Sequence, residues 1–280
     1  MTRQLIVNAD DFGRTRGVSA GVIRAHREGI VTSTTALMNM PGVVNDLHLA
    51  RSDAPRLGLG VHLNFTAGRP LLPTEWCASL VDEHGHFLTQ EAIAANPDRI
   101  KPDELRAELK SQVTTFKNAM EHLPDHLDAH HFVHLFPALF QVYLEVADAF
   151  KLPVRIPFPR AEADLEHMPP ILGDVPIETA KSILHTDQQV LAQHPVKAPD
   201  HFVATFYDKT VSVPFLQSIL ASLPQGTSEL MTHPGVLDDQ LRQESQYNLR
   251  REDELAVLTN SQVIEYLARL DIKLITFADL

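Results

Sequence analysis

The chain has 280 residues, 44% of them hydrophobic and 21% charged, a composition typical of a globular protein that can bury a core without disulfides. Its formal net charge of −12 argues against a nucleic-acid-binding surface, which needs clustered Lys and Arg. The single cysteine excludes an internal disulfide and suits a reducing compartment. Because we find no apolar leader at the N-terminus and no run of about 18 apolar residues, we expect a cytoplasmic protein without a membrane span.

Short apolar runs alternate with longer stretches of helical periodicity along the chain. The predicted strands are residues 4–9, 33–39, 57–65, 126–130, 153–156, 201–205, 228–233 and 272–277. The predicted helices are residues 18–28, 43–52, 103–122, 138–150, 177–194, 213–222 and 261–269. This alternation is typical of a parallel α/β architecture, and the strand count suits a complete or distorted barrel.

Two segments interrupt the alternation, residues 66–102 and 157–176. The first is rich in Pro, His and Gly, and the second in Pro. Loops of this length in a compact protein are often lids or binding loops. Since no linker splits the chain, we expect residues 1–280 to form a single domain.

Two adjacent carboxylates, Asp10 and Asp11, follow the first predicted strand. Carboxylates so close together repel unless a cation or a proton lies between them. The alternative is a solvated turn in which they cap the helix that follows.

The strand predicted at 57–65 carries a polar end. Its side chains alternate between two faces, and one face changes from glycine to His62 and Asn64 towards the end of the strand. Such a face suits a strand that opens into a site, whereas a histidine satisfied in the core is the alternative.

The segment DHLDAHHFVH, residues 125–134, contains four histidines and two aspartates. If it is extended, one face carries His126, Asp128 and His130. His131 then points the other way, and Pro137 predicts that the next helix begins too late to include His134. The alternative to a functional cluster is a hydrogen-bonded polar turn.

His233 ends the run 228–233, and Pro-Gly after it turns the chain. All these polar groups therefore stand at the C-terminal ends of predicted strands, where active sites of parallel α/β folds lie. One carboxylate and two imidazoles can form an open metal site, a second carboxylate can take a proton from water, and a histidine can protonate a leaving group. The pattern predicts metal-assisted hydrolysis of an amide, an ester or a phosphoester.

Six segments together resemble the YdjC/ChbG family of carbohydrate deacetylases. In chain order they are NADDFG (8–13), TSTTALMNMP (32–41), GVHLNFT (60–66), DHLDAHHFVH (125–134), ELMTHPG (229–235) and YNLRREDEL (247–255). The resemblance implies a distorted (β/α) TIM-like barrel and removal of an N-acetyl group from a small N-acetylglucosamine oligosaccharide. Diacetylchitobiose, or its 6-phosphate, is the expected kind of substrate, as in chitin degradation.

The resemblance also implies roles for individual residues. Asp11, His62 and His130 would bind one divalent metal ion, Asp10 would be the general base and His233 the general acid. The resemblance implies Mg²⁺, whereas two imidazoles and one carboxylate suit Zn²⁺ or another transition ion better. A homodimer is expected from the resemblance alone.

Further candidate substrate contacts are Asn64, His131, Phe132, Arg155, Tyr247 and Arg250. Phe132 stands where the family often has a third consecutive histidine, and its ring is predicted to shape the sugar pocket. By analogy with other polysaccharide deacetylases, Arg155 would steady the base, unless it is an exposed arginine at a strand end. Tyr247, Arg250 and Arg251 would close over the substrate or its phosphate, unless they belong to a solvated helix start.

Two other functions are compatible with these residues. One is a metal-dependent phosphoesterase on the same barrel, although such enzymes usually need more ligands than the single triad seen here. The other is a non-catalytic sugar-binding protein that retained the fold.

Overall fold

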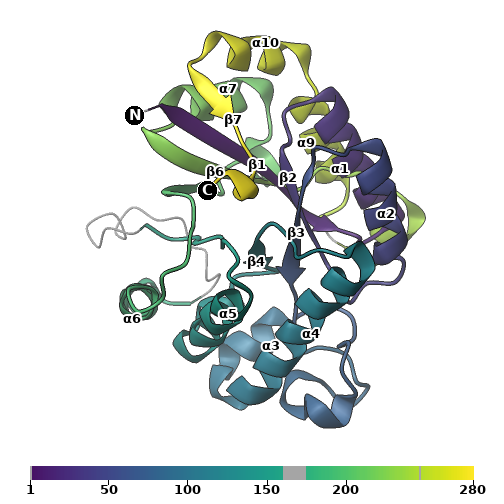
Figure 1. Cartoon of the computed structure of the whole chain (residues 1–280), viewed down its shortest axis with the longest axis vertical. Helices are drawn as coiled ribbons and strands as arrows, with labels where there is room; N and C mark the ends of the chain where they lie inside the picture. The colour runs from purple at the N-terminus through teal and green to yellow at the C-terminus, as the bar shows by residue number, and fades with distance from the viewer. Residues whose placement is uncertain (1, 160–174, 246) are drawn as a thin grey trace. The chain divides into compact units, whose positions relative to one another are not determined.

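The computed structural model describes residues 2–159, 175–245 and 247–280 and shows an α/β fold built on a parallel sheet (Figure 1). The described strands are β1 (Arg3–Phe12), β2 (Ser33–Ala36), β3 (Gly58–Leu63), β4 (Leu127–Ala129), β5 (His201–Val203), β6 (Gly226–Thr232) and β7 (Ile272–Leu274). Their order is β4-β3-β2-β1-β6-β5, and β7 also pairs with β1. The predicted α/β class is confirmed, and the curled parallel sheet is consistent with the predicted distorted TIM-like barrel.

Ten α-helices lie in the described parts of the chain. They are α1 (Arg16–Glu28), α2 (Val43–Asp53), α3 (Gln90–Ala95), α4 (Pro102–Met120), α5 (Pro137–Phe150), α6 (Ile177–Leu191), α7 (Val213–Ser222), α8 (Asp239–Glu244), α9 (Leu249–Leu258) and α10 (Ser261–Arg269). Short 3₁₀ turns are η1 (Thr74–Trp76), η2 (Ala78–Leu80), η3 (Pro97–Arg99), η4 (Val133–Leu135), η6 (Asp208–Thr210) and η7 (Phe277–Asp279). Every predicted helix is present, whereas α3, α8 and α9 were not predicted.

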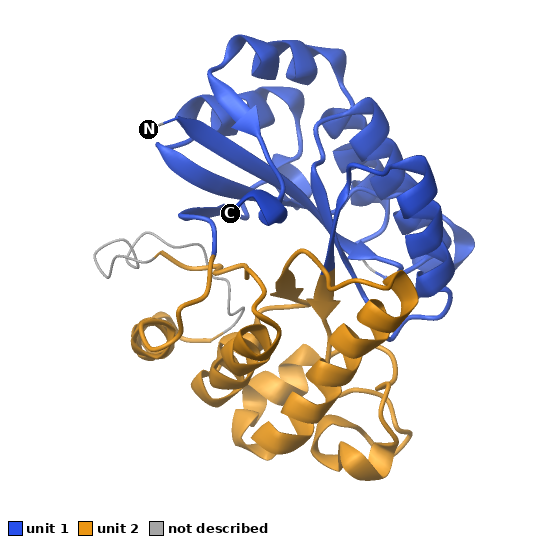
Figure 2. Cartoon of the chain, viewed as in Figure 1, with its two compact units in different colours: residues 1–60, 198–280 blue, residues 61–197 orange. Residues whose placement is uncertain are grey.

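The chain divides into two compact units, coloured in Figure 2. Unit 1 comprises residues 1–60 and 198–280, and unit 2 comprises residues 61–197. In unit 1, α1 packs against β1 and lies beside α2 and α9, while α7 lies beside α10. In unit 2, α5 packs between α4 and α6.

Strand β1 is the centre of unit 1. Its residues from Leu5 onward are buried, as expected of a parallel strand that is covered on both faces. Its first residues pair in parallel with β7 and its last residues with β2, while β6 runs parallel along most of its length. The C-terminal end of β1 is therefore held in place by strands that come from distant parts of the sequence.

The structure corrects two predicted elements, residues 153–156 and residues 66–102. Residues 153–156 do not form a strand: Val154 makes one isolated parallel bridge to Leu127, because prolines at 153 and 157 remove backbone donors from the segment. Residues 66–102 contain α3 and η1–η3 and are tied to α4, where buried Glu108 accepts the backbone N–H groups of Leu71 and Leu72. The predicted loop 157–176 lies mostly outside the described residues.

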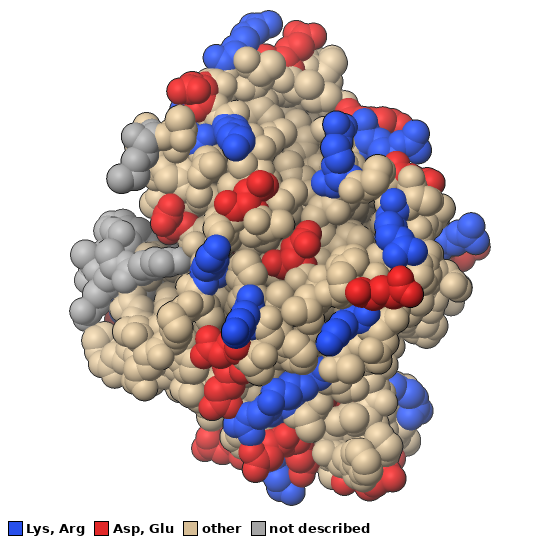
Figure 3. All heavy atoms as spheres, in the orientation of Figure 1, with Lys and Arg blue, Asp and Glu red and all other residues tan. Residues whose placement is uncertain are grey.

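Within the described ranges, no helix combines the length and apolar character needed to cross a bilayer. The face drawn in Figure 3 carries Lys and Arg side chains interspersed with Asp and Glu. Mixed charge of this kind differs from the continuous basic surface that nucleic-acid binding requires.

Candidate functional site

A β-bulge places the two adjacent carboxylates at the end of β1. From Ala9 to Phe12 the strand advances three residues while its partner β2 advances two, from Thr34 to Ala36. Asp11 supplies the distortion, with a left-handed φ of 70° that few side chains tolerate. Because a regular strand sends neighbouring side chains to opposite faces, the bulge re-aims the Asp11 carboxylate relative to that of Asp10.

Both carboxylates are buried and have charged or polar neighbours in unit 1. Asn8 donates its side-chain amide to Asp10 Oδ1 at 2.8 Å, and Arg251 donates Nη2 to Asp11 Oδ2 at 2.5 Å. His233 Nε2 lies 4.0 Å from Asp10 Oδ2. The solvated helix cap considered from the sequence is wrong, since α1 is capped by Thr15 and the two aspartates are at most 3% exposed.

His62 is oriented by a buried carboxylate in unit 2. The parallel register of β3 and β4 places His62 opposite Asp128, and Nδ1 of His62 lies 2.6 Å from Asp128 Oδ1. Arg155 Nη1 lies 2.9 Å from the other Asp128 oxygen. This arrangement fixes the proton on Nδ1 and directs Nε2 of His62 towards a ligand, as carboxylates commonly do for metal-binding histidines.

Arg155 is only 1% exposed, so the exposed-arginine alternative is wrong. Its ion pair is with Asp128, which places it behind a predicted metal ligand. The sequence analogy assigned it instead to the general base.

His130 follows β4 and is held by its backbone, which donates to the carbonyl of Leu63 at 2.9 Å. Its ring lies 5.2 Å from that of His62, edge to face. His131 adopts a left-handed φ of 58°, stacks at 3.9 Å on His130 and places Nδ1 3.0 Å from Thr66 Oγ1. The left-handed backbone of His131 thus leaves the two consecutive imidazole rings close together, with Nδ1 of His131 held near Thr66.

Two other predicted residues in this region have structural contacts. Asn64 closes the turn after β3, because its Oδ1 accepts the backbone N–H of Thr66 and its Nδ2 donates to the carbonyl of Ala67. Phe132 is half-buried, with its ring 6.5 Å from that of His134.

His134 is a core histidine. It lies in η4, before the start of α5 at Pro137 as predicted, and packs 4.9 Å from the ring of Tyr143. Its Nδ1 lies 3.3 Å from the carbonyl of His131. Burial lowers the pKa of His134 to about 3, so the ring is neutral in the folded protein.

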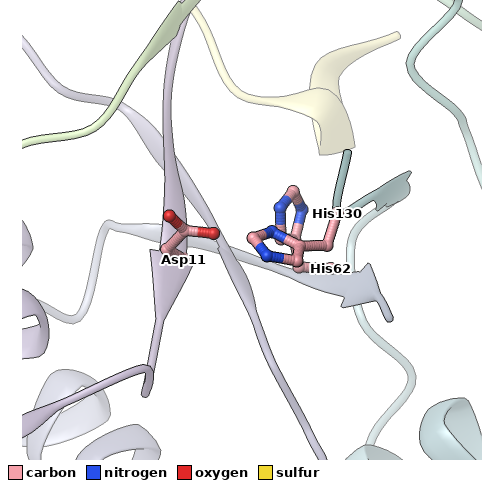
Figure 4. A group of neighbouring side chains, drawn as sticks. All are labelled: Asp11, His62 and His130. Carbon is pink, nitrogen blue, oxygen red and sulfur yellow. The ribbon is translucent and has the colours of Figure 1, made fainter. Parts of the chain in front are cut away.

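Asp11, His62 and His130 each offer one buried ligand atom, and these atoms all lie within 4.8 Å of one another (Figure 4). A second group of the same kind, Asp10, His62 and Asp128, shares His62. The donor set of two imidazoles and one carboxylate fits a divalent ion with open positions for water and substrate. The Nδ1 of His62 is already committed to Asp128, which leaves its Nε2 for such an ion.

Helix α9 contributes one candidate site residue, Glu254, that was not predicted from the sequence. Arg251, Glu254, Leu255 and Leu258 are its buried residues, and their spacing of i, i+3, i+4 and i+7 defines one helical face. The signal was hidden because two of the four are charged. Arg251 donates to Asp11 and Tyr247 donates to Glu254, while their closing over substrate stays a prediction.

Arg250 is on the exposed side of α9. Its guanidinium lies 3.3 Å from Asp208 Oδ1 and 3.0 Å from Asp253 Oδ2. Its charge is therefore offset by two carboxylates.

Tyr247 stacks on Tyr207 with ring centroids 4.3 Å apart. Both rings are T-shaped relative to the His233 ring, with centroid distances of 5.4 and 5.7 Å.

The comparisons with known proteins cover nearly the whole chain. The YdjC-like protein family model matches residues 4–269. Carbohydrate deacetylases of Thermoanaerobacter pseudethanolicus and Enterococcus faecalis are 32% and 33% identical, over 99% of this chain and 98% of each relative.

Solved structures agree with this match. A candidate cellobiose-phosphate cleavage protein of Enterococcus faecalis V583 superposes with a TM-score of 0.84 at 33% identity, covering 100% of this chain and 99% of that chain. The Xyl-CE4 domain of a xylanase from the hindgut metagenome of Trinervitermes trinervoides reaches a TM-score of 0.50 at 10% identity, over 100% of this chain and 89% of that chain. At that identity the likeness concerns the fold alone.

Proposed function

Because the chain belongs to the YdjC-like protein family, we propose that it is a metal-dependent carbohydrate deacetylase. The substrate is a small N-acetylglucosamine oligosaccharide such as diacetylchitobiose or its 6-phosphate, from which water removes one N-acetyl group as acetate. Relatives named carbohydrate deacetylase that align along nearly their whole length support the reaction class. The observation that carries the proposal is the buried group of Asp11, His62 and His130. Asp10 precedes Asp11 in the chain, and His233 Nε2 lies 4.0 Å from Asp10 Oδ2.

Asp11, His62 and His130 would hold one divalent ion. Such an ion, when bound, acts as a Lewis acid towards the acetamide carbonyl and lowers the pKa of water. The resemblance implies Mg²⁺, whereas the imidazole ligands and the carboxylate behind His62 favour Zn²⁺ or another transition ion. Metal analysis of protein purified without added metal decides between them.

Asp10 and His233 provide the proton transfers. Asp10 accepts the proton of the attacking water, and the amide of Asn8 holds its Oδ1 so that Oδ2 faces His233. His233 donates a proton from Nε2 to the departing amine nitrogen, which could not leave as an anion. The 4.0 Å between Nε2 and Oδ2 is short enough for both groups to act on one tetrahedral centre.

The proposal is tested by acetate release. Metal-reconstituted protein is incubated with N,N′-diacetylchitobiose, with its 6-phosphate and with longer chitooligomers, in Mg²⁺ or Zn²⁺ and after chelation. We expect acetate with at least one substrate, lost on chelation and restored by metal. Absence of acetate with every substrate and both metals would overturn the substrate assignment, and phosphate release in its place would favour the phosphoesterase.

Three wider expectations accompany this function. We propose that residues 1–280 act as one catalytic domain, that the protein is a homodimer and that it works in the cytoplasm. Light scattering after size-exclusion chromatography measures the mass in solution and tests the homodimer.

A further inference from the structure

Glu254 of α9 is fully buried and contacts His233 twice. Its Oε2 accepts the backbone N–H of His233 at 2.6 Å. Its Oε1 lies 3.9 Å from Nδ1 of the same histidine and accepts the hydroxyl proton of Tyr247 at 2.5 Å. All three residues belong to unit 1. Both oxygens of one buried carboxylate therefore converge on the histidine and its aromatic neighbour.

Burying a carboxylate costs free energy unless hydrogen bonds or opposite charges replace the lost hydration. Burial, together with the negative charge of Asp10, raises the pKa of Glu254 to about 7, although the hydrogen bonds from His233 and Tyr247 and the charge of Arg251 oppose the rise. A backbone anchor between α9 and the end of β6 would need only one acceptor, which a neutral side chain could supply. The second oxygen, Oε1, accepts the hydroxyl proton of Tyr247 and lies on the Nδ1 side of the imidazole, so the carboxylate does more than anchor the backbone.

We propose that Glu254 is the positioning residue for His233, setting the orientation and protonation of its imidazole. This inference rests on the proposed function. The carboxylate draws the Nδ1 proton towards itself, and Nε2 is left on the side of Asp10. In such pairs the carboxylate also stabilises the imidazolium form. The proton passes from Nε2 to the amine nitrogen as the C–N bond breaks, and the imidazole is left neutral with its proton on Nδ1.

The 3.9 Å separation is about 1 Å longer than a hydrogen bond, and such contacts often tighten only when substrate binds. The rings of Tyr207 and Tyr247 meet the His233 ring at interplanar angles of 71° and 72° and confine it. Among the described residues of unit 1, the charged and titratable groups around the pair include Asp10 from β1, Arg251 and Tyr247 beside Glu254, and Tyr207 from the segment before η6.

The first test requires no activity. The pKa and tautomer of His233 are measured by NMR of ¹⁵N-labelled imidazoles in the full chain, comparing wild type with Glu254→Gln. We expect the pKa of His233 to fall by at least about one unit, as on removal of a nearby opposite charge, and the fraction protonated on Nδ1 to fall. Glu265→Gln is the matched control, since that exposed side chain on α10 pairs with Arg269. Unchanged pKa and tautomer of His233 in Glu254→Gln would overturn the proposal.

The second test uses acetate release. We expect Glu254→Gln to lower kcat by about 10–100-fold with little change in KM, as for other residues that orient a reacting group. In a His233→Ala background the same substitution should cause no further loss, because Glu254 acts through His233. A full additional loss there would contradict the proposal, and retained activity in Glu254→Asp would support it.

Folding and metal binding are controlled separately. Metal affinity by calorimetry and the urea midpoint are measured for Glu254→Gln, because Arg251 lies between Glu254 and Asp11. Activity loss explained by weaker metal binding would overturn the proposal. If wild type releases no acetate, the proposed function fails, while the NMR comparison still decides whether Glu254 controls His233.

Discussion

At the scale of single residues, the candidate site contains two residues whose backbone adopts the left-handed conformation. Asp11 and His131 have φ values of 70° and 58°, conformations that cost non-glycine residues free energy and that cluster at functional sites. Each lies beside another polar residue of the site, Asp10 and His130. In each pair the left-handed residue directs its side chain away from the direction that a regular strand would impose.

Asp10→Asn tests the division of roles between the adjacent aspartates. The amide is nearly isosteric and can still accept the hydrogen bond from Asn8, but it cannot take up a proton. We expect kcat to fall by about 100-fold or more while metal affinity stays near wild type. Acetate release and calorimetric metal titration measure the two effects, and near-wild-type turnover would refute Asp10 as the base.

Asp128→Asn tests the support behind His62. The substitution removes the charge that holds the His62 Nδ1 proton and pairs with Arg155. We expect metal affinity to weaken by about 10–100-fold, the usual effect of losing a carboxylate behind a ligand histidine. Calorimetry measures it, with exposed Asp98→Asn as the control. Equal affinities in the two variants would show that Asp128 does not tune the ligand.

At the scale of elements, α1 and the segment after β6 meet at glycines. A Cβ on Gly21 would lie 2.5 Å from Gly235 Cα, closer than real Cβ contacts allow. Gly235 comes two residues after His233, and Val236 donates its backbone N–H to the carbonyl of Gly17 on the same helix. Close backbone packing between these elements therefore sets the position of the predicted general acid.

Gly21→Ala should separate the two elements. We expect a loss of about 1–3 kcal/mol in the free energy of unfolding, as for overpacked cores, together with a lower kcat because His233 moves. Urea denaturation and acetate release are the measurements. Gly42→Ala is the comparison. Gly42 has a φ of +85°, and a Cβ added there would meet no atom within 4 Å. We therefore expect about 1–2 kcal/mol of backbone strain and an unchanged kcat. Unchanged stability in Gly21→Ala would contradict the packing argument.

Helix α9 shows why one element escaped sequence analysis. Its buried face includes Arg251 and Glu254, which periodicity analysis counts as surface residues. They are buried because each has a partner distant in sequence, Asp11 and His233. The segment 153–156 illustrates the opposite error, since its apolar character predicts a strand but its flanking prolines limit it to a single bridge.

At the scale of the whole molecule, buried titratable groups make stability depend on pH. His134 has a folded pKa of about 3, below its usual 6.5, so the unfolded chain binds more protons between these values. Stability therefore falls as the pH drops through 6.5 and continues to fall towards 3, by about 1.4 kcal/mol per pH unit where the difference is one full proton. The stability that comes from keeping His134 neutral is fully present only above pH 6.5, the pKa of this histidine in the unfolded chain.

His134→Gln isolates this contribution, because glutamine keeps a donor for the carbonyl of His131 but takes up no proton. Between pH 6 and pH 4 we expect wild type to lose about 2 kcal/mol more unfolding free energy than the variant. Urea denaturation across that range gives both curves. Parallel curves would mean that His134 is protonated in the folded protein.

The sequence by itself determined the α/β class and which strand ends carry the polar groups. Alternation of strands and helices is a local periodicity, and the C-terminal ends of parallel strands meet at one edge of a sheet. Local patterns of this kind singled out Asp10, Asp11, His62, the cluster 125–134 and His233 as candidate site residues, and the family resemblance chose His130 from that cluster. Their roles remain proposals.

Only the tertiary structure decided which groups support these residues. Asp128 and His62 are 66 positions apart in the sequence, and Arg251 and Asp11 are 240 positions apart. Strand register and helix packing bring these pairs into contact, and no local pattern encodes either. The same packing made His134 a neutral core residue and offset the charge of Arg250 with carboxylates. A buried charge is stable only beside its partner, and the fold as a whole chooses that partner.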